Sequence, residues 1–176
     1  MFSKLPWDDK LKDLTLMKET ANKLFKEGKF YRASKIYHNI NYRFNYGDVF
    51  GSNVEENEKK LKESNQDLLS RLIDIRNTSH LNFANCKLKI NKFFTAFETA
   101  EKVIKNFDGN SQKGLYIYGK SAIILKKYQN ALEAFETLVK LSPNTKDFND
   151  GLEEVKSLIQ KENFEKKNLY KKMIFK

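Results

Sequence analysis

The sequence predicts an all-α protein. The chain of 176 residues holds only two prolines and seven glycines, which is too few to punctuate the many turns of an all-β fold. Its apolar content of 40%, with 13% aromatic residues, is enough for a folded core despite 32% charged residues. We therefore expect helices throughout, arranged as one domain or as a short array of repeats.

A pattern of helix, short turn and helix recurs along the chain. It is clearest in QKGLYIYGKSAIILKKYQNALEAFETLVKLSP, where a KKY turn joins two helices and a proline follows. The landmarks of this third copy are Gly119, Tyr128, Ala131, Phe135 and Pro143. Two weaker copies precede it, one with Phe30, Ala33 and Tyr37 and the other with Ala84, Phe93 and Ala96. Small residues at such positions let two helices cross closely, and the aromatic residues fill the space between neighbouring pairs.

The spacing of the landmarks sets the expected order of elements within a single domain, 1–176. Ala96 and Ala131 are 35 positions apart, whereas Ala33 and Ala96 are 63 apart, so the first repeat is lengthened. The chain divides into a lead-in, LPWDDKLKDL, at 5–14, a first repeat at about 12–47, a polar loop at about 47–62, a second repeat at about 63–109, a third at about 111–144 and a long C-terminal helix at about 146–172.

The third copy resembles the tetratricopeptide (TPR) consensus, with glycine, aromatic, alanine, phenylalanine and proline landmarks in register. The long first repeat, the tryptophan in the lead-in and the ending EKKNLYKKMIFK resemble the TPR domain of large FKBP-type immunophilins and related co-chaperones. This resemblance runs from about Trp7 to Phe175. It implies a superhelical array of three helix pairs with a long C-terminal capping helix. A prolyl-isomerase domain does not fit beside it, so we expect a C-terminal region of a longer protein or a member lacking that domain.

Three polar stripes appear when the first helix of each pair is read at helical spacing. They consist of Lys18, Asn22 and Phe25; of Asn82, Asn85 and Lys89; and of Lys113, Ile117 and Lys120. These stripes carry hydrogen-bond donors and no carboxylate, a combination that suits a carboxylate ligand. The alternative is a solvated face on each helix, which is the preferred interpretation for Asn85 and Lys89.

Four residues of these stripes are similar in type and register to the dicarboxylate clamp of chaperone-binding TPR proteins. They are Lys18, Asn22, Asn82 and Lys113, and the arginine of the clamp is replaced by Ile117. The resemblance implies a peptide partner, the acidic C-terminal tail of a heat-shock chaperone of the ninety- or seventy-kilodalton class. We expect Lys120 to compensate in part for the missing arginine. Phe25 and Leu88 are expected either to contact apolar side chains of the peptide or to belong to the core.

Other functions are weaker interpretations of the sequence. The net charge of +10 points to an acidic partner, but it rests mainly on lysine, which argues against specific nucleic-acid reading. One alternative is a TPR scaffold with a different acidic or helical partner, and another is non-specific binding of RNA or an acidic membrane. The basic, amphipathic C-terminal helix makes calmodulin a further candidate partner, and its other interpretation is a capping helix.

No catalytic or metal-binding pattern surrounds His38, His80 or Cys86, so neither an enzyme nor a cofactor is expected. The single cysteine fits a reducing compartment. No secretory signal and no apolar run of about 20 residues are recognisable, which predicts a cytoplasmic protein without a membrane span.

Overall fold

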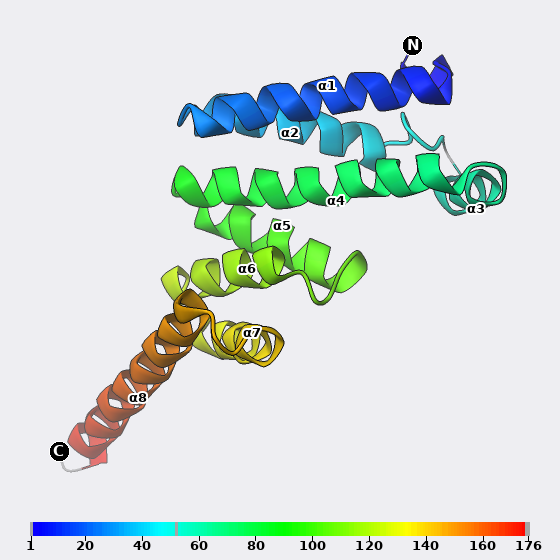
Figure 1. The fold of residues 1–176 in the computed structure, drawn as a ribbon. Coiled ribbons are helices and arrows are strands. Elements are labelled where there is room, and N and C mark those ends of the chain that lie inside the picture. Colours follow the sequence, from blue (N-terminus) through cyan, green and yellow to red (C-terminus); the bar gives the residue numbers. More distant parts are fainter. Residues whose placement is uncertain (1, 52, 175–176) are drawn as a thin grey trace. The chain divides into compact units, whose positions relative to one another are not determined.

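The computed structural model describes residues 2–51 and 53–174, and within them the chain is helical with no strand. A short 3₁₀ helix, Phe2–Lys4, comes first. It is followed by α1 (Trp7–Lys26), α2 (Phe30–Asn45), α3 (Val54–Ser64), α4 (Gln66–Lys89), α5 (Phe93–Asn106), α6 (Gln112–Ile124), α7 (Tyr128–Leu141) and α8 (Lys146–Ile174). The expected all-α architecture is confirmed, with helix pairs α1/α2, α4/α5 and α6/α7 and a long last helix (Figure 1). None of the helices in the described part is long and apolar enough to cross a membrane.

The chain divides into two compact units, Met1–Thr99 and Ala100–Lys176, with the boundary inside α5. In the first unit, α1 and α4 lie side by side and α2 packs against both (Figure 1). Ala21 of α1 and Ala33 of α2 are both fully buried, and such small side chains permit close helix crossing. Tyr37, Ile40 and Leu72 complete the centre of this core with no exposed surface.

One turn geometry joins the two helices of every pair. Gly28, Asn91 and Lys126 each adopt a positive φ, of 74°, 59° and 57° respectively. The amide of the residue after each of them donates to the carbonyl five positions earlier, for instance Lys127 N to Ala122 O at 2.8 Å. This is the Schellman ending of a helix, in which the left-handed residue is usually glycine. The three copies therefore share a backbone turn that the residue types alone do not reveal.

The loop expected at about 47–62 differs from the structure, because its second half folds as α3. Strong helix formers fill VEENEKKLKES, Glu55 and Glu56 lie in the first turn where the helix dipole favours them, and Leu61 is buried. Asn65 then caps the next helix, since its Oδ1 accepts a hydrogen bond from Leu68 N at 3.0 Å. The polar composition predicted a loop, but Leu61 and an ion pair between Glu58 and Arg76 of α4 at 2.7 Å dock a short helix there.

The lead-in forms the first turns of α1, which begins at Trp7. The Trp7 ring lies 6.1 Å from that of Phe50, between ring centroids. Lys10 is only 5% exposed and its Nζ donates to the carbonyl of Val49 at 3.0 Å. Burial lowers the pKa of Lys10, against an opposing effect of Asp48. Trp7 and Lys10 thus hold the chain that follows α2 against α1.

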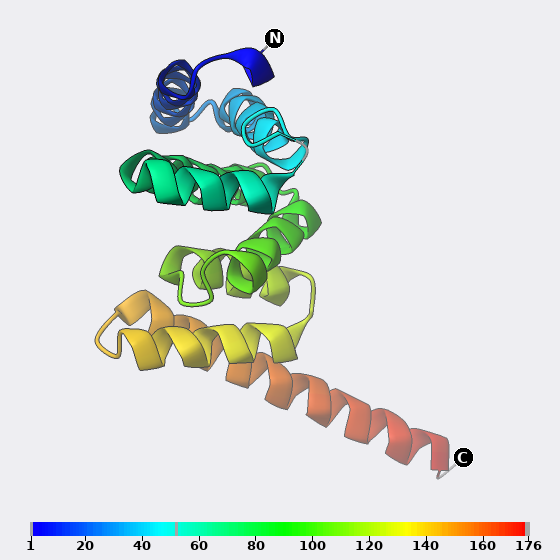
Figure 2. The same cartoon turned by 90° about the vertical axis from the view of Figure 1, so that its right-hand side faces the viewer.

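The second unit packs α7 against α6 and α8 around Phe135, which is fully buried. Gly119 of α6 and Gly151 of α8 flank this ring so closely that a methyl group on either would collide with it. Beyond these contacts α8 continues past the end of α7 (Figure 2). That distal part leaves Phe164, Leu169, Tyr170 and Met173 largely exposed. Phe175, where the expected resemblance ends, lies outside the described residues.

Candidate functional site

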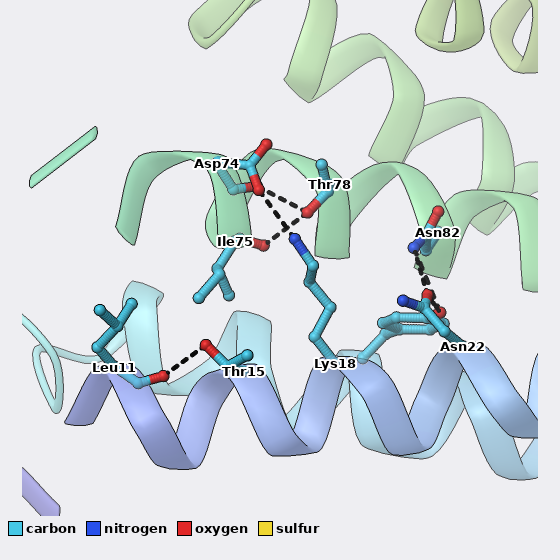
Figure 3. Close-up of polar contacts among 9 residues, drawn as sticks. Leu11, Thr15, Lys18, Asn22, Asp74, Ile75, Thr78 and Asn82 are labelled. Atoms are coloured by element: carbon cyan, nitrogen blue, oxygen red, sulfur yellow. Dashed lines mark hydrogen bonds and ion pairs between the residues drawn. The ribbon is translucent and has the colours of Figure 1, made fainter. Parts of the chain in front are cut away.

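Polar side chains from α1 and α4 face one another in the first unit (Figure 3). Lys18 and Asn22, one turn apart, come from α1, and Asp74, Thr78 and Asn82, at successive turns, come from α4. Helical spacing of four residues places each set on one face of its helix. We call Lys18, Asn22, Tyr37, Asp74 and Asn82 the α1–α4 polar cluster, because hydrogen bonds connect its members in two groups.

The first group ties both asparagines to a buried tyrosine of α2. The Tyr37 hydroxyl donates to Asn22 Oδ1 at 2.6 Å. Asn82 Nδ2 donates to the same Asn22 oxygen and to the Tyr37 oxygen, each at 3.2 Å. Burial, reinforced by the Cys86 thiol, raises the pKa of Tyr37 to about 12 although the Asn82 hydrogen bond opposes it. The hydroxyl is therefore a proton donor at every physiological pH.

These bonds fix the orientation of the Asn22 amide. Its oxygen accepts two hydrogen bonds from within the protein, so the NH₂ group is the part that Asn22 can offer to a ligand. Asn82 differs, because its Nδ2 already donates two hydrogen bonds, one to the Asn22 oxygen and one to the Tyr37 oxygen. Donation from Asn82 to an incoming anion would require one of them to be exchanged.

The second group is an ion pair. Lys18 Nζ lies 2.8 Å from Asp74 Oδ2, and the two side chains point toward each other between the helices (Figure 3). Sequence reasoning described this surface as free of carboxylates and missed Asp74. The signal that could have revealed it is spacing, because Asp74 precedes Asn82 by two helical turns and so shares its face.

A surface pocket of about 480 Å³ opens on the same two helices. Its lining includes Leu11 and Thr15, which lie about two turns and one turn before Lys18 on the same face of α1, and Arg71 of α4. Arg71 also lies 3.9 Å from Asp67 through its Nη1. The walls of this pocket combine apolar, cationic and acidic side chains, since Asp8 and Glu19 line it as well.

The remaining predicted donors lie on α6, in the second unit. Lys113 is exposed in the first turn of this helix. Ile117 is only 2% exposed, so the position where the clamp has arginine belongs to the core. Lys120 Nζ forms an ion pair with Glu154 Oε2 of α8 at 2.9 Å. Lys120 therefore already has an acidic partner within its own unit.

The two predicted apolar contacts have different surroundings. Phe25 packs edge-on against Phe30, with ring centroids 5.0 Å apart, and adjoins the core of the first unit. Leu88 is half-buried near the end of α4. Both retain some exposed surface, and their contact with a peptide stays a prediction.

Catalytic or metal-binding groups do not emerge elsewhere in the described residues. No cluster of three or more His, Cys, Asp or Glu side chains there could hold a metal ion. His80 is buried and its Nδ1 hydrogen-bonds to the Arg76 carbonyl at 2.9 Å, and Cys86 is buried as well. Both side chains are therefore part of the protein interior.

Comparison with known proteins identifies relatives of this chain, although no family model matches it. Human peptidyl-prolyl cis-trans isomerase FKBP4 is 28% identical over 166 residues, which are 94% of this chain and 33% of that protein. The Arabidopsis thaliana isomerase PASTICCINO1 is 32% identical over 129 residues, covering 73% of this chain and 18% of the relative. The chain thus spans about a third or less of the length of these curated relatives.

Solved structures agree in fold. The C-terminal TPR-containing domain of a putative FK506-binding protein from Plasmodium falciparum superposes with a TM-score of 0.72 at 22% identity, covering 93% of this chain and 99% of that one. The first TPR domain of human RPAP3 gives a TM-score of 0.58 at 20% identity, with coverage of 85% and 95%. At these identities the likeness concerns the fold alone, and it confirms the repeat architecture that the sequence landmarks predicted.

Proposed function

On the premise that this chain is an all-α TPR array whose relatives are FKBP-type immunophilins, we propose that it is a peptide-binding module of the co-chaperone type. Its ligand is the acidic C-terminal tail of a heat-shock chaperone, of the ninety- or seventy-kilodalton class. The described residues form helices and no strand and match a TPR-containing domain, which supports a binding function and not proline isomerisation. As an adaptor with one buried cysteine, it is expected to work in the cytoplasm.

The observation that carries the proposal is the convergence of Lys18 and an oriented Asn22 on one face of α1, opposite Asn82 of α4. A ligand carboxylate gains most from N–H donors combined with a cation, and each charged hydrogen bond contributes about 1.5–3 kcal/mol. A few such bonds and shallow apolar contacts give roughly micromolar binding, which weakens as salt is added.

Four further residues are proposed to contribute. Lys113 is an exposed residue of α6, and Lys120 of the same helix must release Glu154 to act as a donor. Phe25 and Leu88 are proposed to meet apolar side chains of the peptide. Ile117 supplies no donor where the clamp has arginine, so we expect weaker binding than in a complete clamp.

A second candidate function is a TPR scaffold for a different acidic or helical partner. The pairing of Lys18 with Asp74 favours this alternative, because Lys18, one of the residues predicted to bind the peptide carboxylate, already has an acidic partner. Such a scaffold would not require the free C-terminus of its ligand.

Calmodulin is a separate candidate partner, through α8. Phe164, Leu169, Tyr170 and Met173 are 59–68% exposed on a stretch rich in lysine, and basic amphipathic helices suit such a partner. Calcium-dependent co-elution with calmodulin, lost when Leu169 and Met173 are changed to serine, would support this assignment. Co-elution that persists in the double variant would contradict it.

The decisive test of the main proposal is calorimetric titration with a pentapeptide ending in Glu-Glu-Val-Asp and with its C-terminally amidated form. Binding that amidation abolishes supports the clamp, and binding of both forms favours the scaffold. Lys18→Ala and Asn22→Ala should each weaken binding by roughly tenfold or more. Lys59→Ala, which removes an exposed lysine of α3, is the control for net charge. If neither peptide binds at millimolar concentration, the chaperone-tail proposal fails.

A further inference from the structure

Asp74 places a carboxylate of the protein itself on the ammonium that is proposed to bind the carboxylate of the peptide. Lys18 and Asp74 are 56 residues apart in sequence and come from different helices. Their 2.8 Å contact is therefore a product of α1 packing beside α4. The Asp74 carboxylate approaches Lys18 as a ligand carboxylate would, with a charge-assisted hydrogen bond.

The two partners differ in how firmly their surroundings hold them. The Lys18 side chain is 22% exposed, whereas that of Asp74 is 60% exposed. Most of the lysine is covered by protein, so its ammonium stays near the face of the cluster. Asp74 can rotate into water and recover hydration there, and exposed ion pairs of this kind are weak. The contact is thus strong enough to form and weak enough to be displaced.

We infer that Asp74 is an internal competitor for the carboxylate site at Lys18. This inference rests on the proposed function. An incoming carboxylate must either displace Asp74 or share one ammonium with it, and two carboxylates at such short separation repel each other. Asp74 thereby lowers the affinity for every anionic ligand of Lys18. Only a ligand with additional contacts, such as a tail that also engages Asn22, overcomes this competition.

The charge of Asp74 can be removed with little change in shape. Asp74→Asn keeps the size of the side chain and abolishes the negative charge, so it should strengthen binding of the Glu-Glu-Val-Asp pentapeptide by roughly two- to fivefold. The matched control is Glu63→Gln, which removes an exposed carboxylate of α3. It changes net charge by the same amount, and α3 contributes no residue to the α1–α4 polar cluster.

A double-variant cycle isolates the effect at Lys18. In a Lys18→Ala background, Asp74→Asn should no longer strengthen binding, because there is no ammonium left to release. Four chains are titrated with the pentapeptide, namely the original protein, the two single variants and the double variant. Thermal unfolding followed by circular dichroism checks that each remains folded.

The outcomes separate this inference from the proposed function. A gain for Asp74→Asn that exceeds that of Glu63→Gln, and that vanishes without Lys18, supports internal competition. If Lys18→Ala weakens binding but Asp74→Asn leaves it unchanged or weakens it, the proposed function stands and this inference is overturned. In that case Asp74 holds Lys18 in position for the ligand. If no variant binds the peptide, both fail together.

Discussion

The hydroxyl of Tyr37 on α2 donates a 2.6 Å hydrogen bond to the side-chain oxygen of Asn22 on α1. Tyr37 has no exposed surface, so it does not meet a ligand itself. Its effect is to turn the Asn22 amide so that the oxygen points into the protein and the NH₂ group remains for a ligand. Tyr37 is thus a positioning residue for the proposed carboxylate site, located behind it in the core.

Tyr37→Phe should weaken peptide binding and slightly destabilise the fold. Removal of the hydroxyl eliminates two hydrogen bonds of the network, and we expect the free energy of unfolding to fall by about 1 kcal/mol. Because the Asn22 oxygen then keeps only the 3.2 Å bond from Asn82 Nδ2, its amide is held less firmly, and affinity for the pentapeptide should fall by roughly three- to tenfold. Titration and urea denaturation measure the two effects. Tyr31→Phe, at an exposed tyrosine of the same helix, is the control, and unchanged affinity in Tyr37→Phe would remove the positioning role.

The same tyrosine predicts a loss of stability at alkaline pH. The pKa of Tyr37 is raised from 10.0 to about 12 by burial in the folded state, so between these values the unfolded chain loses its proton first. Ionisation then favours unfolding, so the free energy of unfolding falls as pH rises from 10 toward 12. Below pH 10 the Tyr37 hydroxyl keeps its proton in both states, and its effect on stability does not depend on pH.

Urea denaturation between pH 9 and pH 12 would measure this dependence. The slope of unfolding free energy against pH should be shallower in Tyr37→Phe than in the original protein. Some slope should persist, since burial also raises the pKa of Tyr118. Identical slopes in the two proteins would show that Tyr37 ionises normally in the fold.

Gly151→Ala should destabilise the second unit through Phe135. A methyl group at Gly151 would overlap the Phe135 ring, whose opposite side is limited by Gly119. Overpacking of this kind costs about 1–3 kcal/mol, offset by about 1 kcal/mol from the better helix propensity of alanine. We expect a net loss of up to about 2 kcal/mol in urea denaturation. Gly109→Ala, where the new carbon would make an ordinary 3.6 Å contact, should change stability far less, and equal effects of the two would refute the argument.

Lys126→Gly should stabilise the protein. Lys126 occupies the left-handed position that Gly28 fills in the first pair, and a side chain there costs roughly 1–2 kcal/mol. After subtraction of the greater entropy of glycine in the unfolded chain, a gain of about 0.5–1 kcal/mol remains. The reciprocal change, Gly28→Ala, should destabilise although nothing lies within 4 Å of the added carbon. Thermal denaturation measures the change in melting temperature of each variant. A rise in both variants or a fall in both would contradict the explanation.

Features that depend on local spacing were predictable from sequence. The Ala33, Ala96 and Ala131 landmarks located the second helix of each pair, since small residues are needed wherever helices cross closely. Lys18 and Asn22 were correctly assigned to one helical face because four residues make about one turn. The helix α3 was missed for the complementary reason, as a polar sequence shows little periodicity when only Leu61 is buried.

Contacts between helices required the tertiary structure. Lys18 with Asp74, Lys120 with Glu154, and Gly151 with Phe135 each join residues of different helices. Helical periodicity states which residues of one helix share a face, but the residue opposite depends on the crossing angle and the axial offset of the packed pair. The sequence by itself therefore determined the helices apart from α3, their pairing and the donors on each face. Tertiary packing decided that one donor meets an internal carboxylate, that Ile117 is buried, and that a hidden tyrosine orients Asn22.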